Sequence, residues 1–312
     1  MARKRWLGVG LLALAMLLTP AADGVAKALS TDTSPIAIAF LRYLVAGLAG
    51  LLAARLAGRP IVVPRQDRMG QVVRTALIMA AMTAFIAALG MVPLAKAVGG
   101  FLIAPIVSGM LGILVWREPP SLPRLAGAAV SCAGAALLLR PEAGVGAGSL
   151  CALGGGVLLG TYLAAQRGAA GATDALSTLA VQSLLGALML APFALASGLP
   201  APTLGLAGGA LALGLVSAAC HGLTVAAYAR AEASVLAPFL YLNLVTALAA
   251  GYFWFGEAMD PAALAGLAGI AGGGLLTLLA PSPRVQPSSA RSIRNRTRPI
   301  PSRRTVSVAV TA

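Results

Sequence analysis

Charged and catalytic side chains are scarce in this sequence. Only 10% of the 312 residues are charged and 59% are hydrophobic, whereas soluble domains carry about 25% charged residues. Nine acidic residues and one histidine supply no cluster for acid–base catalysis, and the chain lacks GxxxxGK[ST], HExxH and GxSxG motifs. The three cysteines, Cys132, Cys151 and Cys220, form no CxxC pair. We therefore expect no metal, no cofactor and no separate catalytic domain.

Long apolar segments dominate instead, and they predict an all-α integral membrane protein. A span needs about 20 mostly apolar residues, so the chain has room for about ten. The predicted helices cover residues 6–28, 35–54, 75–92, 97–116, 124–139, 149–166, 175–197, 204–228, 234–256 and 262–280. Ser34 before Pro35, and Asp260 before Pro261, each predict an N-cap followed by proline at the first helical position.

The basic residues predict the orientation, because Lys and Arg near span ends are retained in the cytoplasm. With ten spans and both termini cytoplasmic, 19 of the 23 basic residues lie inside. The far side holds only Lys27, Lys96 and Arg140, and Arg42 lies within a span. The cytoplasmic set is Arg3, Lys4, Arg5, Arg55, Arg59, Arg65, Arg68, Arg74, Arg117, Arg124, Arg167, Arg230 and seven arginines of the tail.

Both ends of the chain are basic. Residues 3–5, followed by an apolar run, also fit a secretory signal peptide, and cleavage would leave nine spans. Residues 281–312 are rich in Ser, Pro and Arg and have no acidic residue, so we expect a disordered cytoplasmic tail. Its partners would be the anionic headgroups of membrane lipids rather than nucleic acid.

The sequence repeats itself. A shift of 139 residues pairs Gly112 with Gly251, Glu118 with Glu257, Leu125 with Leu264, Gly127 with Gly266 and Gly134 with Gly273. The match of Glu118 with Glu257 is the most informative because acidic residues are so rare; both lie before a helix start and are expected to be structural. The pattern predicts five-helix halves at 1–140 and 149–280, joined by a linker at 141–148. Five is odd, so the halves would be inverted repeats, as in secondary transporters.

Three segments resemble EamA-type members of the drug/metabolite transporter superfamily. They are SPIAIAFLRYLVAG (34–47), APIVSGMLGILVWREPPSLPRLAGAAVSCAGAALLL (104–139) and AEASVLAPFLYLNLVTALAAGYFWFGEAMDPAALAGLAGIAGGGLL (231–276). The shared pattern is an arginine early in the second helix, here Arg42, and a proline in the fourth helix followed thirteen residues later by glutamate, here Pro105 and Glu118. The resemblance implies two five-helix repeats around a central cavity through which small organic molecules pass.

The chain departs from the family pattern at two places. Leu244 occupies the position of the second-half proline, although Pro238 lies nearer the start of that helix. Arg117 precedes Glu118 where glycine is usual. These departures concern helix bends, and the resemblance does not name the substrate.

Arg42 is the main candidate for a substrate-binding residue, because an ionisable group inside a span is costly unless it is paired, wet or functional. Asp23 lies at a comparable depth on the first helix and is its expected partner or competitor. Together they would attract an anionic or carboxylate-bearing substrate. The alternatives are a structural Asp23–Arg42 pair, or a pair of Asp23 with Lys27 one turn away on the same helix.

Other polar residues fall inside predicted spans and are further candidates for substrate binding: Tyr162, Gln182, His221, Tyr241 and Asn243. A histidine titrates near neutral pH and suits proton coupling, with an interhelical hydrogen bond as the alternative. Tyr241 and Asn243 are two residues apart and face different directions, and Asn243 is the better candidate.

Prolines inside four predicted helices interrupt their hydrogen-bond ladders: Pro20 after Thr19, Pro105, Pro192 and Pro238. Each freed carbonyl needs a cavity, a hydroxyl or another helix, and such breaks occur at substrate sites as well as in simple helix curvature.

These features favour a secondary transporter that moves a small organic metabolite, of the amino-acid, vitamin or drug-like class, across the cytoplasmic membrane by alternating access. Because the chain lacks an ATP-binding motif, a gradient would drive the flux. An intramembrane enzyme and a non-transporting scaffold are the alternatives. The sequence leaves a homodimer, the substrate, the direction and the coupling ion open.

Overall fold

In a computed structural model of the chain, the described helices all belong to one unit, Met1–Pro281. The structure describes residues 2–61, 67–116, 122–139, 146–167, 175–228, 230, 236 and 239–278. The predicted tail and most of the predicted linker lie outside these residues, as do Glu118, Arg140 and Pro238.

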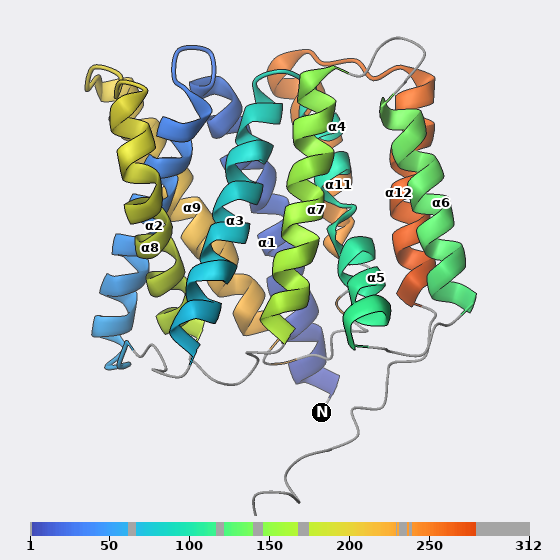
Figure 1. Ribbon diagram of the computed structural model, residues 1–312, viewed down its shortest axis with the longest axis horizontal. Coiled ribbons are helices and arrows are strands. Elements are labelled where there is room, and N and C mark those ends of the chain that lie inside the picture. The colour runs from blue at the N-terminus through green and yellow to red at the C-terminus, as the bar shows by residue number, and fades with distance from the viewer. Residues whose placement is uncertain are drawn as a thin grey trace, which may run out of the picture. The chain divides into compact units, whose positions relative to one another are not determined.

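All regular structure in the described residues is helical, and the helices lie side by side (Figure 1). They are α1 (Ala2–Leu29), α2 (Pro35–Leu56), α3 (Arg68–Leu89), α4 (Leu94–Phe101), α5 (Ala104–Trp116), α6 (Leu122–Leu139), α7 (Ala147–Arg167), α8 (Ala175–Ala196), α9 (Leu204–Tyr228), α11 (Leu242–Phe255) and α12 (Pro261–Leu278).

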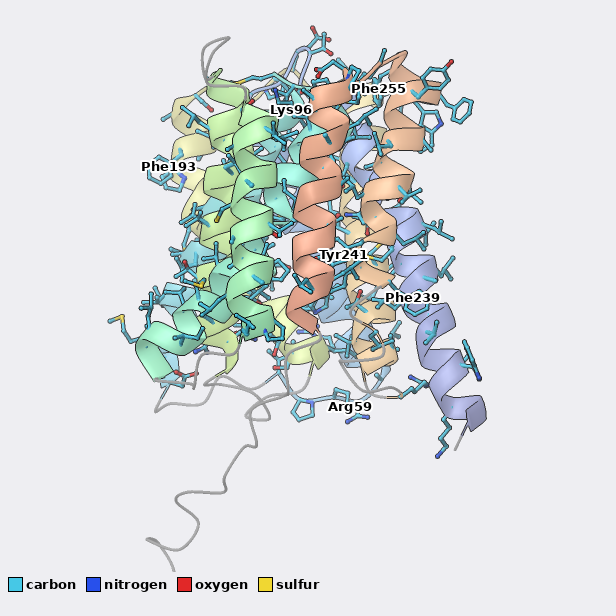
Figure 2. The ribbon with its side chains drawn as sticks, turned by 90° about the vertical axis from the view of Figure 1, so that its right-hand side faces the viewer. Arg59, Lys96, Phe193, Phe239, Tyr241 and Phe255 are labelled. Carbon is cyan, nitrogen blue, oxygen red and sulfur yellow. The ribbon has the colours of Figure 1, made fainter. Side chains whose placement is uncertain are left out.

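Seven segments of the described chain are long and apolar enough to cross a membrane, with α4 and α5 together forming one of them. Three further apolar helices are shorter: Leu125–Leu138, Leu242–Phe255 and Pro261–Leu276. Large apolar side chains face outward, such as Phe193, which points away from the helices in Figure 2 and is 61% exposed. The all-α membrane fold is therefore confirmed, and a crossing by all ten segments stays a prediction.

Both predicted N-caps are present. Ser34 accepts a hydrogen bond at its Oγ from the N–H of Ala37 (3.3 Å), and Asp260 accepts one at Oδ1 from the N–H of Ala263 (2.9 Å). Each cap is followed by proline, which lacks the N–H that a first helical turn leaves unpaired. The caps fix where α2 and α12 begin.

The predicted start of the third helix at residue 75 is wrong, because α3 already begins at Arg68. Arg74 is buried inside the helix, and its Nη2 lies 2.6 Å from Oδ2 of Asp67, just before the helix. The hydrogen bond from Arg74 holds the pKa of the Asp67 carboxyl below its usual range. The charge of Arg74, which suggested that the span begins after it, is thus paired with Asp67 and lies within the first two turns of the helix.

The predicted fourth helix, 97–116, is wrong as a single helix. The structure has α4, which ends at Phe101, and α5, which begins at Ala104, with a turn between them (Figure 1). Pro105 supplies no N–H to the carbonyl of Phe101, so the helical ladder stops there and restarts with proline in the first turn of α5. The broken segment crosses the bundle in two pieces.

Two second-half helices also differ at their ends. The predicted sixth span, 149–166, begins two residues earlier, at Ala147 in α7. Of the predicted ninth span, 234–256, the structure assigns Leu242–Phe255 to α11, which ends on Gly256 in the left-handed conformation (φ 62°). Glycine suits this position because it has no Cβ to clash.

The helices pair across the two halves of the chain. α6 packs on α12, α2 on α8, α1 on α9, and α3 on α7. Under the repeat, α6 corresponds to α12 and α2 to α8, while the α1–α9 pair corresponds to the α7–α3 pair. Figure 1 shows the first two pairs at opposite sides of the drawing. Each helix therefore finds its main partner in the other half.

Glycines bring α6 and α12 close together. A Cβ on Gly134 would lie 2.7 Å from the carbonyl oxygen of Gly266, and a Cβ on Gly273 would overlap the carbonyl oxygen of Gly127. The sequence repeat pairs the same four residues the other way round, Gly127 with Gly266 and Gly134 with Gly273. Such an exchange of partners is the signature of a two-fold axis between antiparallel helices.

The centre of this contact also fits a two-fold axis. Ser131 on α6 donates a hydrogen bond from Oγ to the carbonyl of Ile270 on α12 (3.1 Å), and these two residues are 139 positions apart. A residue that contacts its own repeat equivalent lies next to the axis.

The main buried cluster draws on both halves, with Ile38, Phe85, Ile86, Leu213 and Leu267 among its members. Small residues let the helix backbones approach where lipid provides no hydrophobic drive between helices. The polar residues described next lie within this framework.

Candidate functional site

Polar side chains from four helices meet inside the bundle and form the central polar cluster: Asp23 on α1, Arg42 and Tyr43 on α2, Tyr162 on α7 and Gln182 on α8. Asp23, Tyr43 and Gln182 are 2%, 8% and 7% exposed, and Arg42 and Tyr162 are partly buried. Four of the five, all except Tyr43, were predicted from the sequence. Of these four, Asp23 and Arg42 come from the first half, and Tyr162 and Gln182 come from the second.

Arg42 is the cationic group of the central polar cluster. Its guanidinium interacts electrostatically with the carboxylate of Asp23 and with Tyr43. Its Nη1 atom is buried and has no hydrogen-bond partner in the described residues. A buried donor without a partner costs about 1–3 kcal/mol, and more when it is charged. This nitrogen is therefore available to a bound molecule.

Gln182 offers an unpartnered donor to such a molecule. The hydroxyl of Tyr162 donates to Oε1 of Gln182 (3.0 Å), which occupies the amide oxygen. The amide nitrogen Nε2 remains buried without a partner. The hydroxyl of Tyr43 is likewise buried and unpartnered, and its ring lies 3.2 Å from where a Cβ on Gly186 would stand.

Sequence reasoning missed Tyr43 and Gln166, whose Oε1 is also buried without a partner on α7. Tyr43 adjoins Arg42 in the chain, which was a usable signal. Gln166 lies one helical turn after Tyr162, on the same face of α7, and this i, i+4 spacing would have found it.

Pro20 lies within a continuous α1, and the carbonyl that it leaves free belongs to Met16. Oγ1 of Thr246 on α11 lies within hydrogen-bond distance of this carbonyl (3.1 Å), and its single proton is shared between it and two nearby carbonyls, those of Leu242 (3.0 Å) and Asn243 (3.1 Å). One residue earlier, the carbonyl of Ala15 accepts hydrogen bonds from Oγ1 of Thr19 (2.8 Å) and from Sγ of Cys220 (3.6 Å). The proline in α1 thus creates a docking point for α11. Pro192 also lies within a continuous helix, α8.

The predicted alternative in which Asp23 pairs with Lys27 is wrong. Nζ of Lys27 lies 2.9 Å from Oε1 of Glu257 and donates to the carbonyls of Leu89 (2.7 Å) and Val92 (2.8 Å). The carboxylate that binds Lys27 comes from the other half of the chain, in the turn between α11 and α12.

Glu257 also binds the start of α4. Its Oε2 accepts a hydrogen bond from the N–H of Leu94 (2.7 Å), so the carboxylate stabilises a helix N-terminus, although not that of the helix following it. The Lys27 ammonium lies 5.7 Å from the ring centroid of Phe255. Figure 2 shows Phe255 and Lys96 at one end of the bundle and Arg59 at the other. Lys27 and Glu257 therefore tie the two halves together at the Phe255 end.

The remaining candidates are placed differently. Tyr241 points at α12, where its hydroxyl lies against Gly274 (Figure 2). Asn243 keeps a buried Oδ1 without a hydrogen-bond partner. His221 is partly buried on α9, next to Cys220. In the described part of the chain, no three His, Cys, Asp or Glu side chains gather closely enough to hold a metal ion.

The length and packing of the apolar helices define a multi-pass helical membrane protein. The model of the EamA-like transporter family matches the chain twice, over residues 6–140 and 146–279. The chain therefore belongs to the EamA-like transporter family, as the resemblance of its motifs predicted. The family is one of transporters and not of enzymes.

One similar solved structure is described only as "Crystal structure of protein". It has a TM-score of 0.62 and 20% sequence identity, and the match covers 86% of this chain and 96% of that one. At this identity the likeness concerns the fold alone. No curated protein matches the sequence.

Proposed function

We propose that the protein is a secondary transporter that carries a small organic solute across the cytoplasmic membrane by alternating access. One observation carries this proposal: a buried guanidinium nitrogen of Arg42, without a partner, lies among polar groups contributed by both halves of the chain. Substrate sites of repeat-built transporters lie where the repeats meet. Family membership supports transport as the activity.

The proposal includes ten spans in two inverted five-helix repeats with both termini in the cytoplasm. The exchanged glycine contacts between α6 and α12 support the inversion, because equivalent helices meet antiparallel around a two-fold axis. The separation of Arg59 from Lys96 at the two ends of the bundle supports the orientation read from the charges (Figure 2). We expect lipid contacts around the bundle, and a homodimer remains a prediction.

Each residue of the central polar cluster has a proposed role. Arg42 binds the polar end of the substrate, and Gln182 and Tyr43 add hydrogen bonds to it. Tyr162 holds the amide of Gln182 in place. Asp23 balances the charge of Arg42 while the site is empty.

The test uses the purified chain in liposomes offered a mixed pool of metabolites, with mass spectrometry of the trapped contents. Arg42→Ala should reduce uptake of the enriched compound at least tenfold, because a buried charged hydrogen bond is worth about 1.5–3 kcal/mol. Arg230→Ala is the matched control, since Arg230 is exposed in the turn after α9 and, among the contacts described, its side chain bonds only to the carbonyl of Ala226 near the end of α9.

Two results would contradict the proposal. Unchanged uptake in a folded Arg42→Ala protein would remove the substrate-binding role of this residue. The absence of any enriched compound in the wild type would reopen the enzyme and scaffold alternatives, and formation of a new product would favour the enzyme.

A further inference from the structure

We infer, on the basis of the proposed transport function, that the cargo is an organic anion whose oxyanion group replaces Asp23 at Arg42, and that Asp23 then takes up a proton that travels with the cargo. The protein would be an electroneutral co-transporter of one anion and one proton. This goes beyond transport as such, because it assigns the chemical class of the cargo, the coupling ion and the residue that carries it.

The first step of the argument is the hydrogen-bond capacity of the empty site. Within the central polar cluster, the buried atoms without partners are Nη1 of Arg42, Nε2 of Gln182 and the hydroxyl of Tyr43; the acceptors Oε1 of Gln166 and Oδ1 of Asn243 are also buried without partners but belong to residues outside this cluster. The first two atoms are a guanidinium nitrogen and an amide nitrogen, and such nitrogens can only donate. A ligand that satisfies them must bring acceptors. A carboxylate or another oxyanion does so with charge-assisted bonds, whereas an ammonium group cannot.

The second step concerns the charge of Asp23. This carboxylate is 2% exposed and interacts electrostatically with Arg42. From α9, Cys220 also interacts with both residues. Lys27, one turn along α1, is bound by Glu257 at 2.9 Å and is not available to balance Asp23.

The other helices packed on α1 supply no competing charge near Asp23. α11 contains no charged residue. On α3, Arg74 is bound to Asp67 and Arg68 is the first helical residue. On α4, Lys96 lies at the Phe255 end of the bundle (Figure 2). Among the described residues, Arg42 is therefore the permanent cation that interacts with Asp23, and α9 adds His221 as a further group that can carry a proton.

The third step is the exchange. When the anion occupies the donors of Arg42, the Asp23 carboxylate loses its counter-charge in a buried setting, where an unpaired charge is expensive. Binding a proton to an Asp23 oxygen removes that charge. The occupied site then holds a neutral Asp23, the Arg42 cation and the bound anion. The empty site holds the Asp23 anion and the Arg42 cation. Both forms have the same net charge of zero, so the cycle moves one proton with each anion.

The experiment follows anion and proton together in one preparation. Wild-type protein in liposomes receives an equimolar pool of monocarboxylates, phosphate esters, primary amines and neutral sugars. Mass spectrometry reads the contents, a trapped pH-sensitive dye reads the lumen, and valinomycin with potassium clamps the potential. With the outside one pH unit more acidic, one-to-one coupling accumulates the anion about tenfold and acidifies the lumen. Protein-free liposomes and Arg42→Ala protein define passive entry of weak acids.

Asp23→Asn separates the proton from the anion. The carboxamide imitates the protonated carboxyl, so we expect the anion to enter still, without luminal acidification and without the tenfold response to the pH gradient. Because the empty site would then carry the unbalanced Arg42 charge, uptake would begin to respond to the membrane potential. Asp67→Asn changes a carboxylate outside the central polar cluster and should keep the wild-type coupling.

Three results overturn this inference while leaving transport intact: accumulation of an amine or a neutral sugar instead of an anion, anion uptake by the wild type without acidification, or unaltered coupling in Asp23→Asn. If that variant does not fold, the wild-type proton measurement decides alone. Failure of every compound to accumulate contradicts the proposed function itself, and the inference falls with it.

Discussion

Gly134→Ala should destabilise the fold, because Gly134 is where α6 and α12 touch backbone to backbone. The added Cβ would stand 2.6 Å from the nitrogen of Ile270, 2.7 Å from the oxygen of Gly266 and 2.8 Å from the carbonyl carbon of Gly269. Ordinary van der Waals contact begins at 3.4 Å. These are backbone atoms, so no side chain can rotate away, and the helices must separate.

The magnitude follows from two opposing effects. Overpacking a tight site costs about 1–3 kcal/mol, and three backbone overlaps place Gly134→Ala at the upper end of that range. Replacing a helical glycine by alanine returns about 1 kcal/mol. The net loss is therefore about 2 kcal/mol. For a chain of this size each kcal/mol lowers Tm by about 2–4 °C.

The assay is thermal unfolding in detergent, with Gly272→Ala as the matched control. Gly272 is an exposed glycine of α12 whose added Cβ would meet nothing within 4 Å, so the control should gain about 1 kcal/mol from helix propensity alone. The two substitutions are chemically identical and should shift Tm in opposite directions. A Gly134→Ala protein as stable as the Gly272→Ala protein would refute the close contact.

Two further changes test the contacts that join the halves. Glu257→Gln should lower the unfolding free energy by about 2 kcal/mol, because it leaves the Lys27 ammonium partly buried without its carboxylate. In chemical unfolding, the Lys27→Met, Glu257→Leu double variant should lose less unfolding free energy than Glu257→Gln does. An equal or larger loss in the double variant would contradict the pairing. Thr246→Val should cost about 1 kcal/mol by removing the donor to the Met16 carbonyl. In a Pro20→Ala background, Thr246→Val should have no measurable effect in thermal unfolding, because residue 20 then supplies its own N–H to the Met16 carbonyl. If Thr246→Val costs as much in that background as in the wild type, Pro20 is not the reason for the hydrogen bond from Thr246.

Much of the fold could be predicted from the sequence because its signals are local. Apolar length placed most helices to within a few residues, and Ser34 and Asp260 marked two starts through hydrogen bonds spanning three residues. The break between α4 and α5 had a local cause in Pro105, but the sequence alone did not show whether the helix would bend or stop. The start of α3 was misplaced because Arg74 finds its partner inside the helix.

The site was only partly predictable. Asp23 and Arg42 stood out because charges inside spans are rare, and the structure brings them into electrostatic contact. The alternative that paired Asp23 with Lys27 followed from helical spacing and is wrong, because Glu257, which binds Lys27, is distant in sequence and near only after the halves meet. Tyr43 was not predicted, because nothing in the sequence shows that its hydroxyl is buried without a partner.

The contact between α6 and α12 has the geometry of a symmetric subunit interface, although it lies within one chain. Each half presents a glycine-lined helix and receives the equivalent helix of the other half in antiparallel orientation, so the same kind of surface forms both sides of the joint. A substitution at one of these glycines is therefore felt directly by the equivalent surface of the other half.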